Sequence, residues 1–167
     1  MLRAPLITKP SHIDYLVEIK KYLFAEINDF RCQYNLKPLE RDTALDSTSR
    51  QWSESFKDNE LLRHSLIKNV GENIACVQGS GNIDNAEEEA KELFDTWLNE
   101  LKYLVLNGTW PDCSLTGSWI SVGHISQILW KNTSHIGIGV TFQAKSKRLI
   151  CVTQFYPPGN IEGEKIL

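Results

Sequence analysis

The order in which two hydrophobic periodicities occur along the chain constrains its fold most. Over residues 12–35 apolar side chains recur every three or four positions, which is typical of a helix with one buried face. Near the end, residues 135–142 and 148–156 alternate apolar and polar side chains on either side of a polar link, which predicts an antiparallel hairpin. Helices followed by a late hairpin do not make the alternating units of a parallel sheet, so the pattern predicts an α+β fold.

Weaker patterns add further elements between these two regions. We expect a helix over 43–57, a strand over 70–77, a helix over 84–103 with an acidic first turn, and a short helix over 123–130. A chain of 167 residues that is 41% hydrophobic is long enough to bury one core. We therefore expect one domain over residues 1–167, with its core at about 12–160.

The charge pattern and the N-terminus exclude several classes of partner and location. The 18 basic and 21 acidic residues are mixed along the chain without a basic stripe, so nucleic acid is not an expected partner. The N-terminus lacks the apolar stretch of a secretory signal, and Leu2 excludes N-myristoylation. We expect an intracellular protein, or a secreted one if Met1 replaces a cleaved signal.

The four cysteines, Cys32, Cys76, Cys113 and Cys151, are widely spaced. No CxxC pair occurs, so a zinc ribbon is excluded. We expect free, mostly packed thiols in a reducing compartment, although an even number of cysteines also allows disulfides.

Four short motifs occur in a set order along the chain. They are RHS at 63–65, GENIA at 71–75, GHISQILW at 123–130 and YPPGN at 156–160. Each alone is weak, but their order and spacing resemble the CAP superfamily, that is, the SCP domain of cysteine-rich secretory proteins, antigen five and plant pathogenesis-related proteins. The likeness is greatest to the non-secreted, Golgi-associated branch.

The resemblance implies a three-layer α-β-α sandwich, with a small antiparallel sheet between helices. It also implies a cleft with two histidines and two acids, which match His64, His124, Glu72 and Glu100 in this chain. Glu100 is placed by the pattern Trp97-x-x-Glu100, at the end of the acidic helix.

The chemistry of these four side chains allows three interpretations. Two imidazoles can bind a divalent metal such as zinc, with water at the remaining positions. We expect His64 and His124 to face the metal, while Glu72 and Glu100 orient the rings. Alternatively the four groups form only a polar network between the layers, or they take part in catalysis.

The resemblance further implies sterol or fatty-acid binding, known for several family members, and associates sterols with a loop before GHISQILW. In this chain the loop covers residues 103–113, and its candidate lipid contacts are Leu104, Leu106 and Trp110. Such groups can form an apolar, adjustable wall. The alternative is that they merely cover the core.

Three functions remain after this reading. The first is a non-enzymatic module that binds lipid or sterol, at a membrane surface, with a divalent metal in the cleft. The second is a protein-interaction scaffold that self-associates, for instance as a homodimer. The third is a weak metal-dependent hydrolase, which is disfavoured because GxSxG and HExxH are absent and Ser126 should point away from the face of His124.

Several positions depart from the secreted branch of the family. Thr153 and Gly139 stand where secreted members carry cysteines, so their disulfide pattern is broken. The YPPGN motif should be structural, with Gly159 in a left-handed turn. The chain ends at Leu167, and we expect no cysteine-rich tail.

Overall fold

The computed structural model describes residues 11–106 and 121–167 of the chain. In chain order, the first elements are α1 (His12–Gln33), β1 (Glu40–Arg41), α2 (Thr43–Ser55), β2 (Gly71–Gln78) and a 3-10 turn (Ile83–Asn85). They are followed by α3 (Ala86–Leu98), α4 (Leu101–Leu106), α5 (Gly123–Ile128), β3 (His135–Gln143) and β4 (Arg148–Tyr156).

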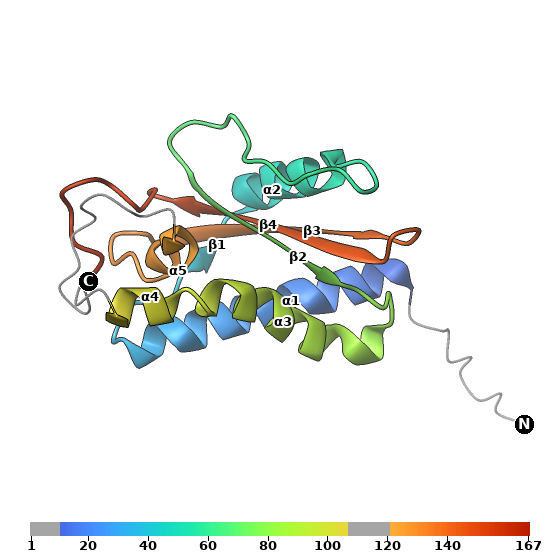
Figure 1. The fold of residues 1–167 in the computed structure, drawn as a ribbon, viewed down its shortest axis with the longest axis horizontal. Helices are drawn as coiled ribbons and strands as arrows, with labels where there is room; N and C mark the ends of the chain where they lie inside the picture. Colours follow the sequence, from blue (N-terminus) through green and yellow to red (C-terminus); the bar gives the residue numbers. More distant parts are fainter. Residues whose placement is uncertain (1–10, 107–120) are drawn as a thin grey trace, which may run out of the picture.

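These elements form three layers (Figure 1). The middle layer is a four-stranded sheet in the order β1-β3-β4-β2. Helix α2 covers one face of the sheet, and α1 and α3 lie side by side on the other face (Figure 1). The predicted α+β sandwich is confirmed.

A small antiparallel sheet was predicted, and the pairings are antiparallel except at one edge, so the sheet is mixed. Strand β4 pairs antiparallel with both β2 and β3, but β1 pairs parallel with β3 through Glu40 and Arg41. A strand of two residues is too short to show an alternating pattern, so the sequence did not predict β1. The difference from the predicted sheet is therefore confined to the β1 edge.

The alternation along β4 sorts its side chains between two hydrophobic clusters. Leu149, Cys151 and Phe155 belong to the main core, which also contains the buried residues of α1 and α3. Ile150 and Val152 face the other way and pack with Phe56 at the end of α2. Both faces of the sheet are therefore buried, as the three layers require.

Two glycines of β3 allow α2 to lie directly against the sheet. A Cβ atom at Gly137 would lie 2.1 Å from the carbonyl carbon of Leu45. One at Gly139 would lie 2.2 Å from the carbonyl carbon of Ser49. Only glycine permits so close an approach of two backbones. The absence of a side chain at Gly139 thus has a packing role.

Arg31 ties the end of α1 to the segment after α5. Its side chain is fully buried and donates hydrogen bonds to the carbonyl oxygens of Lys37 at 2.9 Å, Ile128 at 2.6 Å, Trp130 at 3.0 Å and Thr133 at 3.2 Å. Burial lowers the pKa of Arg31 to about 10, and the four carbonyls offset the cost of burying its charge. The position of α5 is therefore set partly from α1.

Three cysteines lie in the described ranges, and all of them are free: Cys32 is exposed, Cys76 is half-buried and Cys151 is buried. Burial raises the pKa of the Cys151 thiol. Cys113 lies outside the described residues. Over these same ranges, no helix has the length and apolar character to cross a membrane.

Candidate functional site

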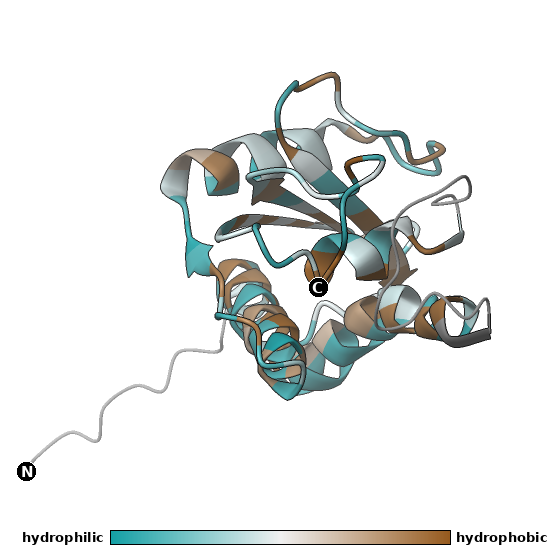
Figure 2. Ribbon diagram, turned by 90° about the vertical axis from the view of Figure 1, so that its left-hand side faces the viewer, coloured by the Kyte–Doolittle hydropathy of each residue, from teal (hydrophilic) through white to brown (hydrophobic). Residues whose placement is uncertain are grey.

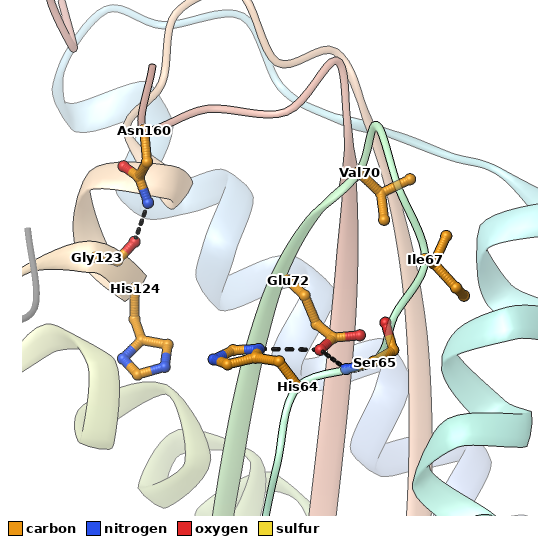
Figure 3. Close-up of a pocket in the computed structure, with 8 residues that line it drawn as sticks. All are labelled: His64, Ser65, Ile67, Val70, Glu72, Gly123, His124 and Asn160. Atoms are coloured by element: carbon orange, nitrogen blue, oxygen red, sulfur yellow. Dashed lines mark hydrogen bonds and ion pairs between the residues drawn. The ribbon is translucent and has the colours of Figure 1, made fainter. Parts of the chain in front are cut away.

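A cavity of about 460 Å³ opens beside β2, one of the two edge strands of the described sheet. Both candidate histidines, His64 and His124, line it together with Glu72 (Figure 3). The rest of its lining is Ser65, Ile67, Val70, Gly123 and Asn160. Folding therefore brings into one hollow two imidazoles that are distant in the sequence.

The loop between α2 and β2 supplies His64, and β2 supplies its acid. The Nδ1 atom of His64 lies 2.9 Å from Oε1 of Glu72, which also accepts a hydrogen bond from the backbone N–H of Ser65 at 2.8 Å. This bond to Glu72 raises the pKa of His64. Burial raises the pKa of Glu72, but the hydrogen bonds from His64, Gln154 and Ser65 outweigh it and leave the pKa below its usual value. An ionised Glu72 therefore anchors His64.

The second histidine is anchored in the same way from the other side. His124 lies in the first turn of α5, and its Nδ1 atom lies 2.6 Å from Oε1 of Glu100. The other carboxylate oxygen accepts from the backbone N–H groups of His124 at 2.9 Å and Ile125 at 3.0 Å. The Trp97 ring stacks on the His124 ring, with 6.4 Å between centroids. Acid and indole together fix the imidazole.

Glu100 does not lie within one continuous helix, as the pattern over 84–103 predicted. The structure has a 3-10 turn, then α3, a turn at residues 99–100, and α4 from Leu101. The carboxylate of Glu100 bonds the first amides of α5, a contact that helical periodicity does not report. The turn places Glu100 where it reaches His124.

The two imidazoles present their remaining nitrogens to one another. Each carboxylate binds Nδ1, and Figure 3 shows the Nε2 atoms of His64 and His124 pointing toward each other across the cavity. A carboxylate at Nδ1 favours the tautomer whose Nε2 carries a lone pair, which is the form that binds metals. The described residues contain no group of three or more His, Cys, Asp or Glu arranged around a metal position. The donor set thus fits a cation held by two imidazoles and otherwise by water.

The YPPGN motif supports the floor of the site, but not through the predicted left-handed turn at Gly159. Asn160 adopts the positive φ of 59° instead. Gly159 is required for close packing, since a Cβ atom there would lie 2.8 Å from the Trp130 ring. Its N–H donates to Oε1 of Gln127 at 2.7 Å, and Asn160 donates to the carbonyl of Gly123 at 2.7 Å.

Ser126 is not placed to act as a nucleophile with His124. Its side chain is fully buried, and its hydroxyl donates to Oδ1 of Asn160 at 2.6 Å. Its bond instead joins α5 to the YPPGN turn.

Of the three candidate lipid contacts, only the side chain of Leu104 lies in the part of the chain that the structure describes. Leu104 is 2% exposed and belongs to the main core, which favours its alternative role as a core residue. Leu106 is the last residue of α4, but the structure does not describe its side chain. Trp110 lies entirely outside the described residues.

Sequence reasoning missed two polar residues behind Glu72. Gln154 of β4 is fully buried and donates from Nε2 to Oε2 of Glu72 at 3.0 Å. Thr48 of α2 donates to Oε1 of Gln154 at 2.5 Å. Alternation along 148–156 could have placed Gln154 on the face of Ile150 and Val152, but it does not give the register that pairs Gln154 with Glu72.

Comparison with known proteins identifies the family. The profile of the cysteine-rich secretory protein family, CAP, matches residues 24–155. The chain is 26% identical over 140 residues to the Golgi-associated plant pathogenesis-related protein 1 of Homo sapiens, covering 82% of this chain and 81% of that protein. It is also 26% identical over 138 residues to a PR-1 type pathogenesis-related protein of Sambucus nigra, covering 83% and 75%.

Solved structures show the same fold at lower identity. Na-ASP-1 aligns with a TM-score of 0.70 and 21% identity over 89% of this chain, which spans only 41% of that protein. NaASP2 with Zn2+ aligns with a TM-score of 0.60 and 21% identity, over 98% of this chain and 89% of that one. Because the profile matches most of its length, the chain belongs to the CAP family of cysteine-rich secretory proteins.

Proposed function

We propose that this CAP domain is a non-enzymatic binding protein whose cleft holds a divalent metal, zinc, between His64 and His124. One observation carries the proposal: two imidazoles, each anchored at Nδ1 by its own carboxylate, turn their Nε2 atoms toward each other in one cavity. Imidazole is a common zinc ligand, and a carboxylate behind it raises its basicity. A solved relative of the same fold, NaASP2, is described with Zn2+.

The histidines and the glutamates would have different roles at this site. His64 and His124 would bind the metal, while Glu72 and Glu100 hold the rings and balance part of the added charge. A bound zinc would supply a positive charge to which an anionic or polar headgroup is attracted. The buried Ser126 and its bond to Asn160 support a binding role over nucleophilic catalysis.

We further propose that the ligand is a lipid or sterol, met at an intracellular membrane surface. The cavity volume of about 460 Å³ lies in the range of small-molecule sites. Ile67 and Val70 line it beside the polar histidines, so it suits a molecule with a polar end and an apolar body. The human relative is named as Golgi-associated, which supports the location.

Calorimetric titration with zinc tests the metal site. We expect one zinc per chain for the wild type, and loss of binding in His64→Ala and His124→Ala with circular dichroism unchanged. His135→Ala is the matched control, because His135 lies outside the cavity and bonds Ser134. A wild type that takes up no zinc, or a control that loses it equally, would refute the metal role.

Binding of a fluorescent sterol and of a fluorescent fatty acid, each with zinc and with a chelator, tests the ligand class. We expect saturable binding of at least one probe. Absence of saturable binding of both would refute the lipid proposal.

A further inference from the structure

A series of hydrogen bonds connects Thr48 of α2, through Gln154 of β4 and Glu72 of β2, to His64 in the cleft. Thr48 Oγ1 lies 2.5 Å from Oε1 of Gln154, whose Nε2 lies 3.0 Å from Oε2 of Glu72. Glu72 then meets Nδ1 of His64 through its other oxygen, at 2.9 Å. Gln154 is fully buried and directly opposite Glu72 in the β2–β4 register. Each of these contacts is a direct hydrogen bond between side chains.

The chemistry of each group decides which partner donates in each of these hydrogen bonds. An ionised carboxylate only accepts hydrogen bonds, so the amide NH2 of Gln154 must face Glu72. The amide oxygen then faces Thr48, whose hydroxyl must donate. At the other end, Glu72 accepts from Nδ1–H of His64, which leaves the lone pair on Nε2. Glu72 thus accepts hydrogen bonds from both sides, from Gln154 and from His64, which is consistent with the metal-binding tautomer of His64.

The site contains two histidine–glutamate pairs, His64–Glu72 and His124–Glu100, here called the His64 arm and the His124 arm. The two arms differ in the groups that hydrogen-bond to the glutamate. Glu100 is held by two backbone N–H groups of α5, which cannot be removed by substitution. Glu72 accepts one backbone N–H, from Ser65, and its second oxygen accepts from the side chain of Gln154. The Ser65 side chain also helps to lower the pKa of Glu72. His64 itself lies in a loop and its side chain is 64% exposed, against 33% for His124. The His64 arm therefore has more to gain from a side-chain support.

We propose that Thr48 and Gln154 are positioning residues that hold Glu72, and through it His64, in the geometry and tautomer that bind a metal. This inference rests on the proposed function for its zinc readout only. The competing explanation is that the two residues merely fasten α2 to the sheet. A contact of that simpler kind exists on the same helix, where the hydroxyls of Ser53 and Thr141 lie 2.9 Å apart with no link to the cleft.

The test uses four variants of the full chain. Thr48→Val removes the hydroxyl at nearly constant volume, and Thr48→Ser retains it. Gln154→Leu removes the hydrogen bonds that join Thr48 to Glu72, while Ser53→Ala removes the matched contact between α2 and the sheet. Zinc affinity is measured by titration, and the His64 tautomer is read from imidazole 15N shifts in the metal-free protein.

We expect Gln154→Leu to weaken zinc binding about 10-fold, the lower end of the effect of residues that support metal ligands. Thr48→Val, one bond further away, should weaken it about 3-fold, while Thr48→Ser and Ser53→Ala stay close to the wild type. The Nδ1–H tautomer of His64 should lose population in Gln154→Leu and Thr48→Val alone.

Two results would overturn the proposal. One is wild-type tautomer populations in both Gln154→Leu and Thr48→Val. The other is an equal change in Ser53→Ala, which would show that fastening of α2 is sufficient. If the wild type binds no zinc, the proposed metal function fails, but the tautomer readout still decides whether Thr48 and Gln154 position His64.

Discussion

Replacing Glu100 with glutamine should disable the His124 arm while changing few atoms. The carboxylate accepts three N–H groups: Nδ1 of His124 at 2.6 Å and the backbone amides of His124 and Ile125 at 2.9 and 3.0 Å. A glutamine side chain has one accepting oxygen. If that oxygen stays with the two amides, the NH2 group faces Nδ1 and selects the tautomer with the proton on Nε2. The nitrogen facing the cavity then cannot bind a metal.

The size of both effects follows from these contacts. Hydrogen bonds to a charged group contribute about 1.5–3 kcal/mol each, and glutamine loses one of them and weakens two. The free energy of unfolding should fall by about 2 kcal/mol, which lowers the Tm by about 4–8 °C in a domain of this size. Loss of an acid behind a metal ligand should weaken zinc binding about 10- to 100-fold.

Urea denaturation and zinc titration of Glu100→Gln check these two values. Glu54→Gln is the matched control, because Glu54 pairs with Arg50 on the exposed face of α2, with half of its side chain accessible. Such a surface pair contributes at most about 1 kcal/mol. Zinc affinity at the wild-type level in Glu100→Gln, or a stability loss no larger than that of the control, would show that the acid does not hold His124 as described.

Other substitutions test the packing and the pH response. Arg31→Met should lower the free energy of unfolding by about 3 kcal/mol in urea, since it leaves four carbonyls without their donor; a loss no greater than that of exposed Arg50→Met would contradict this. Gly139→Ala should cost about 1–3 kcal/mol, because the new Cβ meets the backbone of α2 at 2.2 Å; unchanged thermal unfolding would count against that packing. In the metal-free protein, the pair of charged His64 and Glu72 is complete below pH 6.5 and above pH 4.5, because the pKa of His64 is raised from 6.5 and that of Glu72 is lowered from 4.5. Its contribution is lost as the pH rises through the folded pKa of His64 or falls through that of Glu72. The stability difference between wild type and Glu72→Gln should therefore be larger at pH 5.5 than at pH 9, and an equal difference at both would contradict the pairing.

Elements with a strong local period could be predicted from the sequence. The helix over 12–35 is α1, His12–Gln33, and the hairpin strands are β3 and β4 within one residue of their predicted bounds. These elements depend on the spacing of their own apolar side chains and on a polar link, both of which are visible in the sequence.

Features that depend on tertiary contacts could not be predicted in this way. Strand β1 exists because two residues pair with β3, and the turn at residues 99–100 accompanies the bonds of Glu100 to α5. Gly159 was assigned to a turn because its sequence context suggests one, whereas its role is close contact with Trp130. In each case the deciding partner lies far away in the sequence.

The candidate site was predictable only in part, for the same reason. His64, Glu72 and His124 lie in short motifs, so the family likeness could assign them before the cavity was known. Gln154 and Thr48 lie in no motif. Their relation to Glu72 depends on the register between β2 and β4 and on where α2 rests on the sheet.

Anomalous diffraction at the zinc absorption edge, from crystals grown with zinc, tests the proposed metal site most directly. The proposal predicts one peak between the Nε2 atoms of His64 and His124, and no such peak in His124→Ala. Zinc bound only elsewhere on the chain, or a cavity without a peak at saturating zinc, would contradict it.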